Sequence, residues 1–218
     1  MNPSRPGSLI ALRHFSFPRP IACSLVSGDL ESFFTVRIRE PIGTYMSISK
    51  GDPIVFGLMV SDSAVIRGGF ILSRKEGSIT ISPDTTTPIT IERRKSPRFP
   101  VSLLGRVNSV NGRECSIPAR IKDISYDGIR IYTEYDLNIR DSICVSIREG
   151  AKEPDIMGTV VRNARMFGRN EYGVQIMDRS GGTVSSVKEF IDFIAVQEEH
   201  MIEEVLLRSL HHVDGQQS

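Results

Sequence analysis

The sequence predicts a mainly β protein with two successive β domains and one C-terminal helix. Short apolar segments separated by Gly, Asp and Ser turns fill residues 21–90. Apolar and polar residues alternate through much of residues 91–178, which is the pattern of a half-buried antiparallel sheet. From residue 183 to about residue 210, neither Pro nor Gly interrupts an apolar stripe with three- and four-residue steps. We therefore expect a flexible leader at 1–20, β domains at 21–90 and 91–178, and a helix with a tail at 179–218.

The leader is assigned from its prolines. Pro3, Pro6, Pro18 and Pro20 break any amphipathic helix in this region. Arginines without acidic residues are typical of a targeting peptide, but such peptides form amphipathic helices. The sequence therefore favours an extended or poorly ordered segment over a targeting signal.

The first β domain is predicted from five strand-like segments. They cover residues 21–26, 33–39, 53–60, 64–72 and 78–82, with turn residues between them. Residues 53–60 form a continuous apolar run, which suits a strand buried on both faces. A small barrel or split-barrel-like domain is expected here.

The second β domain contains six strand candidates. They lie near residues 101–110, 117–121, 129–131, 143–147, 158–161 and 172–176. Such a set can curl into an antiparallel barrel without open edges.

The helix carries two apolar stretches, separated at Gln197 and Glu198. We expect the first stretch to pack on the second β domain. The second stretch has two interpretations: it covers the same molecule, as most helix stripes do, or it pairs with another chain and makes a homodimer.

Two short motifs carry the chemical information. Residues 93–98 read RRKSPR, with Arg93, Arg94 and Arg98 on a Pro-interrupted segment. Guanidinium groups are planar forks that match phosphate oxygens and the acceptor edge of guanine. Residues 123–128 read DISYDG, in which Asp123 and Ser125 share one face of a strand and Gly128 permits a close backbone approach. Taken alone, this second motif is also compatible with an ordinary turn.

In this order and spacing, the two motifs resemble the RxxxR and D/NxSxxG signature of PilZ domains, bacterial receptors for cyclic di-GMP. The resemblance covers roughly residues 91–178 and implies a six-stranded barrel. It also implies that Arg93, Arg94, Arg98, Asp123, Ser125 and Gly128 bind the ligand, while one or two ligand molecules remain possible.

A β domain placed before a PilZ barrel is similar to the flagellar-brake type of PilZ protein. Our main hypothesis is a cytoplasmic bacterial receptor whose ligand fixes residues 93–98 on the barrel and so changes the orientation of the two domains. The downstream process would be motility or surface attachment in biofilms, through a protein partner that the sequence does not identify. The alternative is an adaptor that keeps the barrel as a scaffold and acts through protein contacts without the ligand.

Other functions are disfavoured by composition. The 27 Lys and Arg nearly balance the 26 Asp and Glu, and Trp is absent, which argues against nucleic-acid binding. No apolar run approaches the roughly 20 residues of a transmembrane helix. The four histidines lack metal-ligand spacing, and no catalytic or dinucleotide motif is present. We expect no catalysis, no metal and no cofactor, with cyclic di-GMP as a ligand only.

Overall fold

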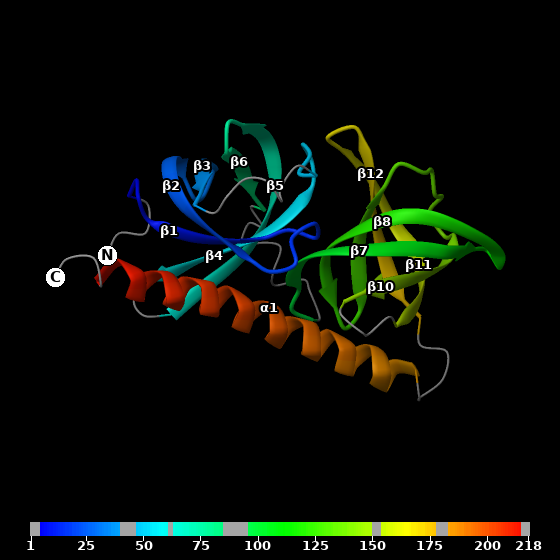
Figure 1. Cartoon of the computed structure of the whole chain (residues 1–218). Coiled ribbons are helices and arrows are strands. Elements are labelled where there is room, and N and C mark those ends of the chain that lie inside the picture. The colour runs from blue at the N-terminus through cyan, green and yellow to red at the C-terminus, as the bar shows by residue number, and fades with distance from the viewer. Residues whose placement is uncertain are drawn as a thin grey trace. The chain divides into compact units, whose positions relative to one another are not determined.

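The protein folds into two compact units. The computed structural model describes residues 5–39, 47–60, 63–84, 96–149, 154–177 and 183–214, with helix side chains described over 187–208. One unit comprises Met1–Thr86 with Gln197–Ser218, and the other comprises Thr87–Val196. Each contains a closed antiparallel barrel of six strands, and the helix α1 (Thr183–Asp214) follows them in the chain (Figure 1). The predicted mainly β fold with a C-terminal helix is confirmed.

The first barrel is formed by β1 (Leu9–Arg13), β2 (Ile21–Asp29), β3 (Phe33–Ile38), β4 (Pro53–Val60), β5 (Ser63–Lys75) and β6 (Ser78–Pro83). Its strand order is β1-β2-β3-β6-β5-β4, closed by pairing between β1 and β4. Strict alternation along β6 turns Ile79 and Ile81 into the core, as expected for a strand with one buried face.

Strand β1 corrects the predicted leader. Residues 9–13 pair with both β2 and β4, and Ile10, Leu12 and the later Phe17 are buried in the barrel core. The flanking prolines exclude a helix, but they do not exclude a five-residue strand between them. The strand is needed to close the barrel, and its partners are not visible from the local sequence.

The second half of α1 covers the outside of the first barrel. Ile202 and Leu206 pack with Ala11 and Val55, so β4 is buried on both faces, as its apolar run predicts. A side chain at Gly57 would overlap Ile202, which shows how closely the helix approaches the strand.

An ion pair also joins the helix to this barrel. Arg13 Nε lies 3.2 Å from Glu198 Oε1, and both side chains are almost fully buried. The second apolar stretch of the helix is thus covered by the same molecule, and the predicted homodimer finds no support in this packing.

The second barrel is formed by β7 (Phe99–Val110), β8 (Arg113–Ser125), β9 (Gly128–Thr133), β10 (Ser142–Arg148), β11 (Asp155–Met166) and β12 (Arg169–Ile176). Its order is β10-β11-β12-β9-β8-β7, which confirms the six-stranded antiparallel barrel. The first half of α1 closes the core, as expected, through Val187, Phe190, Ile191 and Ile194.

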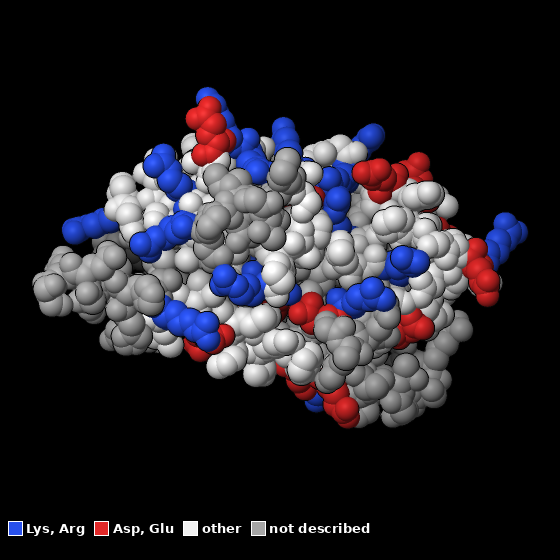
Figure 2. Space-filling view, viewed as in Figure 1, with Lys and Arg blue, Asp and Glu red and all other residues white. Residues whose placement is uncertain are grey.

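The surface carries both signs of charge. Figure 2 shows Lys and Arg side chains mixed with Asp and Glu over the visible face. Within the described part of the chain, no helix has the length and apolar character needed to cross a membrane.

Candidate functional site

The described residues of the two motifs meet at one end of β8. Arg98 lies directly before β7, Asp123 and Ser125 end β8, and Gly128 begins β9. Arg93 and Arg94, the other predicted ligand-binding arginines, lie outside the described residues. The structure therefore places four of the six predicted residues, and it brings Arg98 into direct contact with Asp123.

Ser125 and Gly128 build the turn between β8 and β9. The Ser125 hydroxyl donates to the Gly128 carbonyl oxygen at 3.0 Å and accepts from the Gly128 amide at 3.2 Å. A Cβ atom at Gly128 would lie 2.5 Å from the carbonyl oxygen of Val174 on β12. Both residues thus have a structural role that explains their presence without a ligand.

Asp123 lies between two arginines. Its Oδ1 atom is 2.6 Å from Arg98 Nη1, and its Oδ2 atom is 3.0 Å from Arg130 Nε. The Asp123 side chain is only 8% exposed, whereas that of Arg98 is 32% exposed. Because Ile124 points into the core, its neighbour Asp123 points out of the barrel, where the two arginines contact it.

The Arg130 side chain extends the cluster to β12. Its Nη1 atom lies 3.8 Å from Glu171 Oε1, and Glu171 accepts a hydrogen bond from the Tyr132 hydroxyl. Sequence reasoning did not select Arg130, Glu171 or Tyr132. The alternation of Ile129 and Ile131 could have placed Arg130 on the same outward face as the motif.

The middle of the second motif contacts the helix and the arginine segment. The Tyr126 hydroxyl donates to Asp192 of α1, and this hydrogen bond is the main reason that the pKa of Tyr126 is raised. Ser96, between the two arginines of the RxxxR motif, donates to Asp127. Together with the contact of Arg98, this bond brings the end of the arginine segment alongside the turn.

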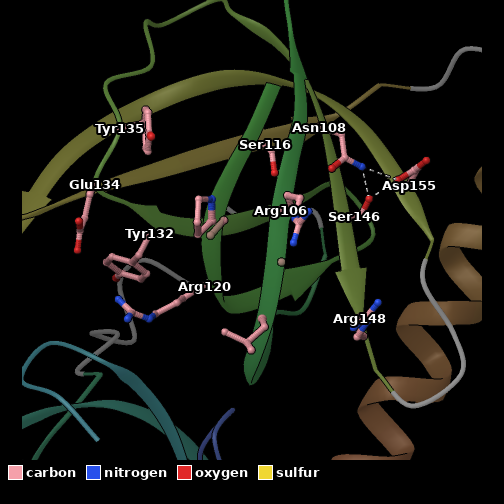
Figure 3. A pocket seen from close by; sticks show the side chains of 14 residues that line it. Arg106, Asn108, Ser116, Arg120, Tyr132, Glu134, Tyr135, Ser146, Arg148 and Asp155 are labelled. Atoms are coloured by element: carbon pink, nitrogen blue, oxygen red, sulfur yellow. Dashed lines mark hydrogen bonds between the residues drawn. The ribbon is translucent and has the colours of Figure 1, made fainter. Parts of the chain in front are cut away.

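A groove of about 870 Å³ lies on the outer face of β7, β8, β9 and β10. Its lining includes Arg106, Arg120, Arg148, Tyr132 and Tyr135, drawn in Figure 3. Arg120 pairs with Tyr132 on the ladder between β8 and β9, two pairs from that of Asp123 with Arg130. Since Tyr132 also bonds to Glu171, the groove begins where the arginine and carboxylate cluster ends.

One wall of the groove is a set of hydrogen-bonded polar side chains. The Ser146 hydroxyl donates to Asp155 Oδ1 at 2.5 Å, and the Asn108 amide donates to both of these residues (Figure 3). Among the residues that the structure describes, no group of three His, Cys, Asp or Glu side chains is arranged to hold a metal ion.

Comparison with protein families finds a match within the second unit. Residues 92–193 match the family model described as the PilZ domain. This segment includes both sequence motifs, and the predicted PilZ resemblance is confirmed for it. A comparison with curated proteins finds no match.

Solved structures to which this chain is similar include the Bacillus subtilis inhibitor of motility MotI/DgrA, with 13% identity, coverage of 95% of this chain and 98% of that chain, and a TM-score of 0.37. Escherichia coli YcgR in complex with c-di-GMP has 9% identity, coverage of 91% and 88%, and a TM-score of 0.44. The K. pneumonia MrkH complex with c-di-GMP has 15% identity, coverage of 97% and 90%, and a TM-score of 0.31.

Proposed function

We propose that this protein is a cyclic di-GMP receptor that binds the ligand on the outward face formed by Arg98 and Asp123, together with Arg93 and Arg94. The observation that carries the proposal is the contact between Arg98 and Asp123, because it joins the two motifs of a PilZ domain at one surface. Ser125 and Gly128 support this surface through the turn that they form.

The chemistry of the surface fits a cyclic diguanylate. The ligand carries two phosphodiester charges, which guanidinium groups bind through charge-assisted hydrogen bonds worth about 1.5–3 kcal/mol each. A carboxylate can accept hydrogen bonds from the N1–H and N2–H groups on the Watson–Crick edge of guanine. Arg98 and Asp123 therefore provide one group for each part of the ligand.

Ligand binding on this surface replaces one contact of Arg98 with another. The guanidinium is one-third exposed and bonds to Asp123 without the ligand, so that bond contributes little net stability. On binding, Arg98 moves to the phosphate or the base and leaves Asp123 Oδ1 to the guanine edge. The exchange keeps Arg98 paired in both states.

We infer that binding orders the arginine segment and fixes the orientation of the first domain, residues 21–90, relative to the PilZ domain, residues 91–178. The boundary between the two compact units falls at Thr86 and Thr87, just before that segment. A ligand that contacts the connecting segment differently in two states can shift the balance between them. The output would be a surface for a protein partner in the bacterial cytoplasm that controls motility or attachment.

The binding proposal is tested by calorimetric titration of the full chain and of an Arg94→Ala/Arg98→Ala variant with cyclic di-GMP. We expect saturable binding to the intact chain, with one or two ligands per chain given by the stoichiometry, and a loss of at least tenfold in affinity in the variant, from about two lost charge-assisted bonds. An Arg37→Ala/Arg113→Ala variant is the matched control, because it removes two exposed arginines that lie outside the two motifs, one on β3 and one at the start of β8. No saturable binding to the intact chain would contradict the proposal and leave the adaptor alternative.

The orientation proposal is tested by small-angle X-ray scattering of the same proteins. We expect the ligand to change the scattering profile of the intact chain but not that of the Arg94→Ala/Arg98→Ala variant. An unchanged profile at saturating ligand would exclude the reorientation and leave the binding proposal intact.

A further inference from the structure

Each oxygen of the Asp123 carboxylate contacts an arginine, and the two arginines differ in their exposure and in their place in the fold. Arg98, on Oδ1, precedes the first strand of the barrel and is 32% exposed. Arg130, on Oδ2, lies within β9 and is only 12% exposed. The Arg98 side chain can therefore exchange its contact with Asp123 for one with a ligand, whereas Arg130 is held by its position within β9.

Arg130 is supported from its far side by β12. Glu171 lies 3.8 Å from the Arg130 guanidinium, and the Tyr132 hydroxyl donates to the other oxygen of Glu171. Glu171 is 4% exposed and Tyr132 is 2% exposed, so the support is almost fully buried. A hydrogen-bonded ionic cluster of this kind restricts the rotamers of its members.

The strand register explains why Arg130 reaches both acids. On one side it pairs directly with Asp123 of β8, and on the other with Gly173 of β12. Glu171 lies two residues from Gly173 and therefore on the same face, diagonal to Arg130.

We propose that Arg130 is a positioning residue that, supported by Glu171 and Tyr132, holds the Asp123 carboxylate in the orientation that selects guanine over adenine. The proposal rests on the function proposed above. When Arg98 turns to the ligand, Arg130 keeps Oδ2 of Asp123 in place, and Oδ1 is left to accept the N–H groups of guanine. Adenine presents an acceptor at N1, which a fixed carboxylate repels.

The balance of charge supports this role. Arg98 and Arg130 offset Asp123 and Glu171 before the ligand binds. After Arg98 has moved, Arg130 still compensates Asp123, so a buried carboxylate does not lose its last cation. Without Arg130, the same step would leave Asp123 unpaired and free to rotate.

The test is a double-mutant cycle on the full chain, with cyclic di-GMP and cyclic di-AMP as probes. Arg130→Met should weaken cyclic di-GMP binding by roughly tenfold or more, as expected for a disturbed charge-assisted hydrogen bond, and should lower the preference over cyclic di-AMP. In an Asp123→Asn background, the same substitution should cost less than about threefold, because Arg130 acts through Asp123. An Arg113→Met variant removes an exposed arginine elsewhere and should leave both affinities unchanged.

Arg130→Lys keeps the charge but not the planar fork, and it serves as the second variant if Arg130→Met does not fold. We expect it to bind cyclic di-GMP with an affinity between those of the intact chain and Arg130→Met. The inference is overturned if the folded Arg130 variants keep the intact affinity and base preference, or if the losses from Arg130 and Asp123 are additive. If the intact chain binds no cyclic di-GMP at all, the proposed function itself fails.

Discussion

Replacement of Gly128 by alanine should destabilise the second barrel even when no ligand is present. The added Cβ atom would lie 2.5 Å from the backbone oxygen of Val174. Ordinary van der Waals separation is about 3.5 Å, so β9 and β12 must move apart by about 1 Å at this point. The atom that must yield belongs to the backbone of a paired strand, and it cannot rotate away as a side chain would.

The expected cost combines three terms. Overpacking costs about 1–3 kcal/mol, and weakening one neighbouring ladder hydrogen bond adds about 0.5–1.5 kcal/mol. Alanine also lowers the conformational entropy of the unfolded chain, which offsets about 0.4–1 kcal/mol of this cost. We therefore expect Gly128→Ala to lower the free energy of unfolding of this barrel by about 0.5–4 kcal/mol.

Tyrosine fluorescence during urea unfolding measures this effect selectively. The chain has no Trp, and four of its five tyrosines fall within Thr87–Val196. Gly173→Ala is the matched control on the same strand pair, because its Cβ would approach no atom closer than 3.2 Å. The reasoning is refuted if Gly128→Ala unfolds within about 0.5 kcal/mol of the intact chain, or if Gly173→Ala loses as much stability.

Three further substitutions test other contacts. Ser125→Ala removes both hydrogen bonds that close the turn after β8 and should cost about 1–3 kcal/mol in the same urea assay, while an unchanged midpoint would contradict the structural role. Glu198→Ala removes the carboxylate that pairs with the buried Arg13 and should destabilise the first unit by about 3–5 kcal/mol, measured by circular dichroism. A stability equal to that of the intact chain would argue against the ion pair. Asp192→Ala removes the hydrogen bond that raises the pKa of Tyr126, so this tyrosine should ionise at lower pH in an ultraviolet titration, and an unchanged curve would exclude the contact.

The strands could be predicted where apolar residues mark them. Residues 53–60 were expected as a strand buried on both faces, and β4 has these bounds. The alternation of apolar residues predicts a short strand at 117–121, whereas β8 runs from Arg113 to Ser125. Its ends are polar, and a register shift between Ile121 and Asp123 interrupts the alternation, so periodicity detects only its centre.

The candidate site was predictable only in part, because motifs report on neighbours in the chain and not on pairing across a sheet. The sequence selects Arg98 and Asp123, which the structure brings together. Glu171 lies 48 positions after Asp123, and only the register of β9 with β12 brings it to Arg130. Ser125 was selected for its hydroxyl, but the structure shows that this hydroxyl bonds within the turn.

The most direct test of the account is a calorimetric titration of the intact chain with cyclic di-GMP and, under the same conditions, with cyclic di-AMP. The account predicts saturable cyclic di-GMP binding with a Kd of about 1 μM or lower, corresponding to about 8 kcal/mol, and binding of cyclic di-AMP at least about tenfold weaker. Absence of cyclic di-GMP binding, or equal affinity for the two ligands, would contradict the central claim that Arg98 and Asp123 form a guanine-selective receptor site.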